Sequence, residues 1–308
     1  MTPLRTPTGR FIGRWASGSP EWHAARRQRI GGSTIAAILG LSPWESPFSV
    51  WCQMAGLADP PPQTKAQERG HYLEPAVAAW FADQHPDWKI VEAGTYVHAE
   101  RDWQLANPDR LIIYPGDDGC ASAVLEIKTA ADDAGWGRPG TDEIPVYYRT
   151  QVQWYLDTLG LQRAYVAVLT GRLRFAEYVV DYDPADAAIM RDHAEEFLAA
   201  LLWGEKPDLD SHPATYTTLQ QLHPQIDNTT VDLDDATAAE YIEAYTEHKR
   251  AEARLNAARA RLAAAMGTAR AAKWRDQVIA TRQAKNGGTP HLVTAHKLPD
   301  PSTWKAVA

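Results

Sequence analysis

The chain has 308 residues and a net charge of −8; 44% of the residues are hydrophobic and 23% charged, which excludes disorder along most of its length. The longest apolar runs, such as 197–203, fall far short of the roughly 20 residues of a membrane helix, and no secretory signal is visible, so we expect a soluble cytoplasmic protein without a membrane partner. Two cysteines exclude a disulfide framework and a four-cysteine zinc or iron–sulfur site.

The N-terminal segment differs from the rest in charge. Residues 1–30 contain six arginines and a single acid, Glu21, so an anionic protein has a basic end that can hold a polyanion locally. Residues 1–20, rich in Pro, Gly, Ser and Thr, are predicted to be a flexible basic arm, and a solvated arm without any ligand is the alternative.

The pattern of apolar residues and turn signals predicts alternating helices and strands. Ser33 is predicted to cap one short helix, and Gly40 to end it. The turn 116–119 is predicted to join two strands into a hairpin. Helices are expected over about 21–29, 33–39, 46–56, 66–84, 146–159 and 184–203, and strands over 89–97, 110–114, 123–127, 164–169 and 175–181.

These elements predict an α/β fold in which a small mixed sheet is flanked by helices, with the core over 21–205. Residues 206–308 are predicted to comprise an acidic linker, one long helix over 236–266 and small C-terminal strands. Apolar residues recur along that helix at helical spacing; the simplest interpretation is a helix packed on the main body, and a partner-binding helix is the alternative. The stripe comprises Tyr241, Tyr245, His248, Leu255, Leu262 and Met266.

One cluster of charged residues indicates chemistry. Asp109 precedes one predicted strand, and Glu126 and Lys128 lie two apart on the next, so their side chains share a face and a hairpin brings Asp109 beside them. Two carboxylates and an ammonium suit a hard cation such as Mg²⁺ bound near a phosphate. The alternative is a surface salt bridge on a strand pair, because this spacing is common by chance.

The surrounding sequence resembles the YqaJ-type viral recombinase nucleases, relatives of phage λ exonuclease in the restriction-endonuclease-like PD-(D/E)xK superfamily. Five pieces carry the resemblance in the same order over about residues 20–205. They are Trp22-His23 with Arg26 and Ile30–Ser33; Ile38–Pro43 with Ser46–Phe48 and Trp51; Gly70 with Leu73–Pro75; Asn107–Asp109 with Leu125–Lys128; and Tyr148 with Gln151–Gln153 and Tyr155-Leu156.

The resemblance implies a role for each matching residue. Asp109 and Glu126 would be metal ligands together with the Ile127 carbonyl, and Lys128 would be the catalytic lysine. Glu74 would help to hold a second ion, and Gln151, rather than Gln153, would lie near the nucleophilic water. Arg26 and Ser33 would bind a 5′-terminal phosphate. The chain departs from the family in having Arg110 where a glycine usually follows the catalytic aspartate.

Each of these residues also has a purely structural interpretation. Glu74 could be an ordinary first-turn acid, Gln151 a solvated helix residue, Arg26 part of a charged face and Ser33 only a cap. Most tryptophans are expected in the core, and Trp136 in a glycine-rich loop is the best candidate for stacking on a DNA end.

The function implied by the resemblance is a Mg²⁺-dependent deoxyribonuclease, with Mn²⁺ as a substitute and two ions in the site. It would be a 5′-to-3′ double-strand DNA exonuclease that exposes 3′ single strand for phage-type recombination. A single-strand annealing protein would be its partner, and a ring-shaped homo-oligomer would hold it on DNA. An endonuclease of the same superfamily, or a nuclease-inactive DNA-end-binding recombination scaffold, remains an alternative.

Overall fold

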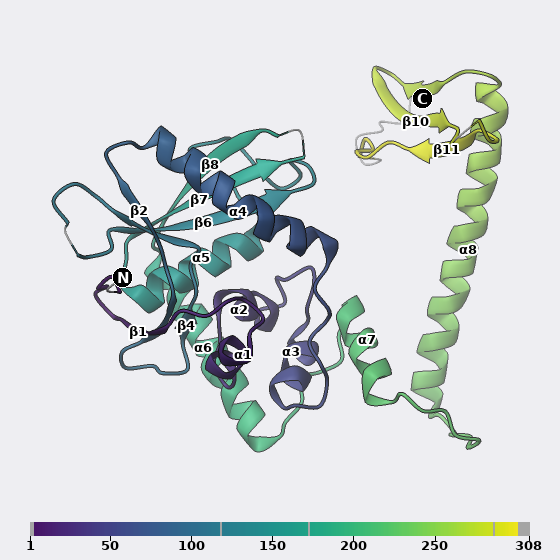
Figure 1. Ribbon diagram of the computed structural model, residues 1–308. Helices are drawn as coiled ribbons and strands as arrows, with labels where there is room; N and C mark the ends of the chain where they lie inside the picture. The colour runs from purple at the N-terminus through teal and green to yellow at the C-terminus, as the bar shows by residue number, and fades with distance from the viewer. Residues whose placement is uncertain (1–2, 118, 172, 286, 301–308) are drawn as a thin grey trace. The chain divides into compact units, whose positions relative to one another are not determined.

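The structure is a computed structural model that describes residues 3–117, 119–171, 173–285 and 287–300 (Figure 1). The chain divides into two compact units, Met1–Ile226 and Asp227–Ala308. No helix in the described ranges is both long and apolar enough to cross a membrane. The helices of the first unit are α1 (Pro20–Arg26), α2 (Gly32–Ile38), α3 (Pro47–Met54), α4 (Lys65–Gln84), α5 (Val146–Leu159), α6 (Pro184–Trp203) and α7 (Pro213–Leu222).

A five-stranded mixed sheet forms the centre of the first unit. Its order is β2-β5-β6-β7-β8, and the strands are β2 (Lys89–Glu92), β5 (Arg110–Ile113), β6 (Ala123–Ala130), β7 (Arg163–Thr170) and β8 (Phe175–Asp181). Strands β5 and β6 form the expected antiparallel hairpin, and β6 and β7 are parallel because α5 connects them. The α/β class, with a small mixed sheet among helices as expected for a restriction-endonuclease-like core, is confirmed.

Alternate residues of the central strands face opposite layers. Leu125 and Ile127 of β6 join the cluster that contains Phe81 of α4, whereas Val124 joins the cluster that contains Leu156 of α5. Burial on both faces explains why these strands are apolar almost throughout. By the same period of two, Glu126 and Lys128 lie on the α5 side of the sheet.

A second, three-stranded sheet corrects the prediction of a flexible arm. Strand β1 (Gly9–Gly13) pairs antiparallel with β3 (Thr95–His98), which in turn pairs with β4 (Leu105–Ala106). The Arg14 guanidinium donates hydrogen bonds to the main-chain oxygens of Ala93 at 2.8 Å and Glu92 at 2.9 Å. Residues 9–14 are therefore held by pairing with a distant segment. Residues 1–2 of the predicted arm lie outside the described residues.

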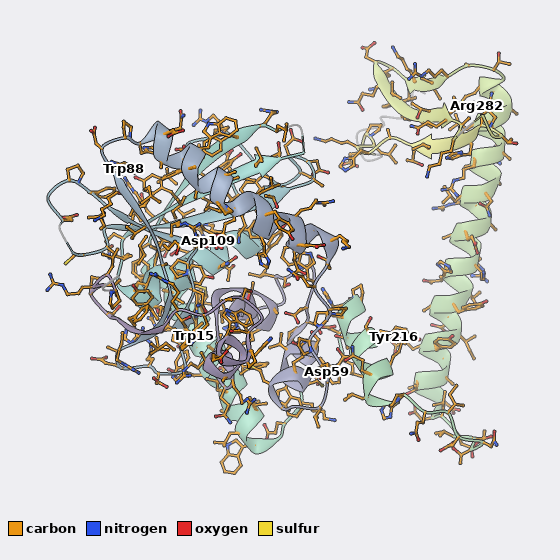
Figure 2. The ribbon with its side chains drawn as sticks, in the orientation of Figure 1. Trp15, Asp59, Trp88, Asp109, Tyr216 and Arg282 are labelled. Carbon is orange, nitrogen blue, oxygen red and sulfur yellow. The ribbon has the colours of Figure 1, made fainter. Side chains whose placement is uncertain are left out.

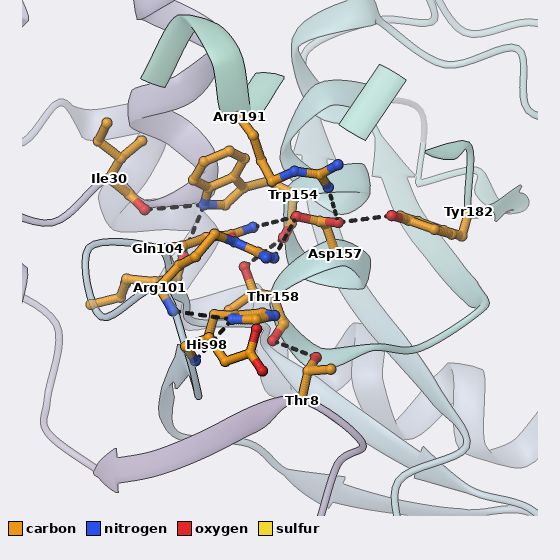
Figure 3. A network of polar contacts seen from close by, with 12 residues as sticks. Thr8, Ile30, His98, Arg101, Gln104, Trp154, Asp157, Thr158, Tyr182 and Arg191 are labelled. Atoms are coloured by element: carbon orange, nitrogen blue, oxygen red, sulfur yellow. Dashed lines mark hydrogen bonds and ion pairs between the residues drawn. The ribbon is translucent and has the colours of Figure 1, made fainter. Parts of the chain in front are cut away.

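Two buried side chains of α5 tie this helix to the surrounding segments (Figure 3). The Trp154 indole donates to the main-chain oxygens of Ile30 at 3.0 Å and Leu105 at 3.1 Å. The Asp157 carboxylate accepts hydrogen bonds from Arg101 at 3.2 Å, Gln104 at 2.8 Å, Tyr182 at 2.7 Å and Arg191 at 2.5 Å. These bonds fix α5 against the segments that carry Arg26 and Asp109.

Several boundaries differ from the predictions. Residues 89–97 form two strands in separate sheets rather than one, and the segment predicted as a linker contains α7. The α7 residue Thr215 is buried, and its hydroxyl is hydrogen-bonded to the Ser46 hydroxyl at 2.7 Å, next to α3. The residue that caps α2 is Gly31, not Ser33, which lies exposed within the helix. The predicted turn 116–119 includes residue 118, which lies outside the described residues.

The second unit contains a long helix and a small sheet. Helix α8 (Asp235–Met266) is followed by β9 (Ala271–Trp274), β10 (Gln277–Gln283) and β11 (His291–Thr294), in the order β11-β10-β9. Of the α8 residues, Met266 is buried, whereas Tyr241, Tyr245 and Leu255 are exposed. The unit therefore does not cover the apolar stripe of α8 by itself.

Candidate active site

The hairpin of β5 and β6 brings Asp109 beside Glu126 and Lys128 (Figure 2 labels Asp109). Arg110 pairs with Leu125, so Asp109, one residue earlier, lies opposite the next part of β6. The Ile127 main-chain N–H donates a hydrogen bond to Asp109 Oδ2 at 2.7 Å. The three charged residues expected from the sequence thus share one site.

Glu126 is the centre of the cluster. Its side chain is 2% exposed, and its Oε1 atom accepts hydrogen bonds from Lys128 Nζ at 2.6 Å and from Gln151 Nε2 at 2.7 Å. Its other oxygen, Oε2, is buried and accepts no hydrogen bond from the described residues. A buried carboxylate oxygen without a donor is unfavourable unless a cation or water completes it.

The shifted pKa values of the cluster also indicate that it lacks a positive charge. Burial raises the pKa of Asp109 well above its ordinary value, and the neighbouring Glu126 carboxylate raises it further. Burial also raises the pKa of Glu126, although Lys128 opposes this. For Lys128, burial alone would lower the pKa, but the carboxylates of Glu126 and Asp109 outweigh it and raise the pKa above its ordinary value. A further positive charge would therefore stabilise the ionised forms of Asp109 and Glu126.

Glu74 lies on α4 and reaches the cluster less directly. Its carboxylate accepts a hydrogen bond from Arg110 Nη1 at 2.7 Å, and the same Nη1 atom donates to the main-chain oxygen of Asp109 at 2.7 Å. Glu74 is near enough to contribute to the raised pKa of Asp109. Arg110, the departure from the family pattern, is thus an ion-pair partner of Glu74, and the expected role of Glu74 at a second ion stays a prediction.

Arg26 and Ser33 meet beside the Asp109 segment. Arg26 Nη1 donates to the Asn107 side-chain oxygen at 3.1 Å, and Nη2 donates to the Ser33 hydroxyl at 3.4 Å. The guanidinium also lies 4.4 Å from the centre of the Trp22 ring. Burial lowers the pKa of Arg26, and the group remains a cation that retains unused donors for an anion.

Two glycines make room for these side chains. A Cβ on Gly31 would lie 2.9 Å from Arg26 Nη2, and a Cβ on Gly32 would lie 2.8 Å from the Gln151 side chain. The close approach of α2 to α5 therefore requires glycine at position 32, and a side chain at position 31 would displace the Arg26 guanidinium. The Gly31-Gly32 pair thus leaves room for the side chains of both Arg26 and Gln151.

Three further residues were not assigned a role from the sequence. Tyr155 accepts a hydrogen bond from Gln151 at 2.9 Å, the Tyr148 ring lies 4.8 Å from Lys128 Nζ, and Asn107 holds Arg26. All three occur in the motif pieces, so their place in the pattern was the available signal. Trp136, by contrast, packs on the Tyr148 and Tyr178 rings at 5.7 and 5.2 Å, so the structure gives it a packing role instead of an exposed stacking position.

The residues present fit a hard cation. Within the described part of the chain, no three Asp, Glu, His or Cys side chains are arranged to hold a metal ion by themselves. A site here would rest on Asp109, the free oxygen of Glu126 and the Ile127 main-chain oxygen, with water completing the coordination. Oxygen ligands with several waters retained are what Mg²⁺ prefers.

Comparison with known proteins identifies the family of this site. Residues 21–162 match the YqaJ-like viral recombinase domain. The chain therefore carries a YqaJ-like viral recombinase domain. The resemblance expected from the motif pieces is confirmed, and the residues of the candidate site, from Arg26 to Tyr155, lie inside the matched range.

The YqaJ protein of Bacillus subtilis (strain 168) is 33% identical to the chain over 214 residues. The match covers 68% of this chain and 64% of that relative, so the chain spans a little under two thirds of the relative's length. Among solved structures, an alkaline exonuclease from Laribacter hongkongensis is similar at 19% identity and a TM-score of 0.49, over 67% of this chain and 100% of that one. A phage related exonuclease from Haemophilus somnus 129PT is similar at 13% identity and a TM-score of 0.43, over 57% and 96%.

Proposed function

We propose that the protein is a Mg²⁺-dependent deoxyribonuclease that degrades double-stranded DNA from 5′ ends and leaves 3′ single strand. The observation that carries this proposal is the buried Glu126 oxygen without a donor, beside Lys128 and Asp109. The YqaJ-like viral recombinase domain and the exonuclease names of the similar structures agree with it. Mn²⁺ would substitute, because it also prefers oxygen ligands.

The side chains divide the chemistry between them. Asp109, Glu126 and the Ile127 carbonyl would hold the metal, and Glu74 would help with a second ion once released from Arg110. When bound, Mg²⁺ would polarise the phosphoryl group and neutralise the charge that develops on it. Because the carboxylates keep Lys128 protonated, its ammonium orients the attacking water and stabilises negative charge on the phosphate. Gln151, fixed between Glu126 and Tyr155, would position that water.

The preference for an end would come from Arg26. The guanidinium offers paired donors to a terminal phosphate, and Ser33 adds a hydroxyl on the first turn of α2. Tyr155 is close enough to influence the pKa of Arg26 and contacts Gln151, so the phosphate pocket and the metal site adjoin. A 5′-phosphate held there would place a nearby phosphodiester for cleavage.

The assembly of the enzyme is part of the proposal. A ring-shaped homo-oligomer would let a chain of net charge −8 retain DNA by enclosing it. Its partner would be a single-strand annealing protein that takes up the exposed strand, and it would act in the cytoplasm, where phage DNA recombines.

The decisive test compares linear 5′-phosphorylated duplex with covalently closed circular duplex, each with Mg²⁺ and with EDTA. An exonuclease removes only the linear DNA and only with metal, and labels at the 5′ and 3′ ends give the polarity. Nicking of the circle would indicate the endonuclease alternative. A mobility shift with neither DNA cut would indicate the inactive scaffold, and either result would overturn the proposal.

A further inference from the structure

The positive charge of the chain is concentrated near its C-terminus. Residues 249–297 contain eleven Lys or Arg and only two acids, Glu252 and Asp276. Residues 1–248 contain nineteen Lys or Arg and thirty-six acids. Residues 249–297 of the second unit therefore reverse the charge of the chain that precedes them, more strongly than the basic N-terminal segment does.

The cations lie on regular elements with their heads in solvent. Arg254, Arg259 and Arg261 project from the C-terminal half of α8, are exposed and make no ion pair with any residue that the structure describes. Lys273 is exposed on β9. Among the residues that the structure describes, Lys249 pairs with Glu252 at 2.9 Å, which neutralises one of these charges.

Helix and sheet enclose a basic groove within this unit. A cavity of about 510 Å³ is lined by Arg259, Ala260 and Ala263 of α8 and by Arg282, Pro290, His291 and Leu292 of the sheet region. Two arginines and a histidine face it from opposite walls, and no acid lines it. The Arg282 guanidinium also donates to the Gly267 carbonyl, which holds the sheet against the end of α8 (Figure 2 labels Arg282).

The helix dipole does not account for this pattern. Cations are favoured in the last turn of a helix, because its carbonyls carry partial negative charge there. Arg254 lies three turns before the end of α8, and Lys273 and Arg282 belong to strands. Unpaired like charges around a groove repel one another, and a polyanion relieves that repulsion.

We propose that this basic surface, comprising Arg254, Arg259, Arg261, Lys273, Arg282 and His291, binds the sugar–phosphate backbone of duplex DNA without reading its sequence. It rests on the proposed function only in taking DNA as the ligand. It would bind duplex away from the DNA ends, whereas the rest of the chain is anionic overall and does not favour such binding. The charge of the backbone, not a terminal phosphate, is what it recognises.

The test measures binding of the full chain to a fluorescent dumbbell duplex, which is closed at both ends, in EDTA. Neither cleavage nor end recognition can contribute there. Removing the two groove arginines in R259Q/R282Q should weaken binding about fivefold to tenfold and make the slope of log K against log salt less steep by about 2, since each lost phosphate contact removes about 0.9. The control R138Q/R163Q removes two exposed arginines of the first unit and should bind as wild type does.

A second variant guards against misfolding, because Arg282 has a structural hydrogen bond. R259E changes one exposed side chain and should weaken binding, per unit of charge changed, at least as much as R259Q/R282Q does. If R259E and R259Q/R282Q both keep the wild-type affinity and salt slope, or if the control falls equally, the inference is wrong. If wild type binds the dumbbell in this way but never cuts linear duplex with Mg²⁺, the proposed nuclease fails and this surface stands.

Discussion

Glu126 of β6 and Asp157 of α5 are both buried carboxylates, but they differ in how many hydrogen bonds their oxygens accept. Asp157 accepts four hydrogen bonds, from Arg101, Gln104, Tyr182 and Arg191, shared between both of its oxygens (Figure 3). Glu126 accepts two hydrogen bonds on one oxygen, and its second oxygen has no donor among the described residues.

This is the difference expected between a carboxylate that stabilises the fold, as Asp157 does, and one that is left to bind a ligand, as we propose for Glu126. A buried charge whose hydrogen bonds are all made holds elements together and gains nothing from a further ligand. A buried charge left half complete costs stability, and a protein retains it where a ligand completes it. Burial alone therefore does not distinguish Glu126 from Asp157, whereas the number of hydrogen bonds that each carboxylate accepts does.

The largest expected effect comes from the lysine of the incomplete site. Lys128→Ala should reduce cleavage of linear duplex about 10²- to 10⁴-fold, the range for loss of a group that acts on the reacting atoms. DNA binding with Ca²⁺ in place of Mg²⁺ should remain largely intact, because Asp109 and Glu126 are still present. Single-turnover cleavage and anisotropy measure the two effects separately. An equal loss of binding would show that Lys128 holds DNA rather than acting on the nucleophile.

The matching change at the complete site should affect stability and not chemistry. Asp157→Asn leaves Arg101 and Arg191 without their counter-charge, which should lower the free energy of unfolding by about 3 kcal/mol, because breaking a buried pair costs about 3–5 kcal/mol and these arginines are partly exposed. The melting temperature should fall by about 6–12 °C. Cleavage measured well below that temperature should be unchanged.

The control for this change is Asp181→Asn, which removes an exposed partner of Arg163. It should alter stability by less than about 1 kcal/mol. If Asp157→Asn proved as mild as Asp181→Asn, or if it abolished cleavage in a folded protein, the contrast between the two carboxylates would be wrong.

The sequence predicted where the candidate-site residues lie better than it predicted the segments that surround them. Helices α5 and α6 begin and end at the predicted residues, because Pro184, Gly160 and Gly204 are local signals that act within one turn. The placement of Asp109, Glu126 and Lys128 on one hairpin followed from the period of a strand and a turn signal, which are also local.

Apart from the misplaced cap of α2, which is local, the segments that the sequence missed depend on contacts between residues distant in sequence. Strand β1 exists through its pairing with β3, and α7 through burial of Thr215 and Thr218 next to α3, and neither segment has a strong pattern of its own. The ion pair of Glu74 with Arg110 and the four donors of Asp157 join residues far apart in the chain. Donors can be counted only once these elements are placed, so the contrast between Glu126 and Asp157 could not be seen from the sequence.

The contrast can be sharpened at the proposed phosphate site, where the Arg26 guanidinium has partners but keeps unused donors. Arg26→Ala should reduce the preference for 5′-phosphate over 5′-hydroxyl ends about tenfold or more, since a hydrogen bond to a charged group contributes about 1.5–3 kcal/mol. Arg26→Lys should retain part of the preference, because it keeps the charge but not the paired donors. Competition between the two kinds of end in one reaction gives the ratio directly. A ratio that is the same in wild type and Arg26→Ala would remove Arg26 from the pocket.

The smallest expected effect tests whether the incomplete site costs stability, and it depends on pH. The pKa of Asp109 is raised by burial and by Glu126, so folding favours its protonated form, and wild type loses stability as the pH rises from the unfolded pKa of about 3.9 to the raised folded pKa. Asp109→Asn keeps the acceptor for the Ile127 N–H without the charge. In EDTA it should match wild type near pH 4 and melt about 2 °C or more higher at pH 8, since 1 kcal/mol corresponds to about 2–4 °C. Mg²⁺ should raise the melting temperature of wild type and not that of the variant. The control Asp102→Asn should show the opposite dependence on pH and be less stable than wild type at pH 8. Hydrogen bonding to Arg29 lowers the pKa of Asp102, so the stability that this carboxylate contributes is lost as the pH falls. A wild type more stable than Asp109→Asn at pH 8 without metal would mean that the cluster is already complete, as that of Asp157 is.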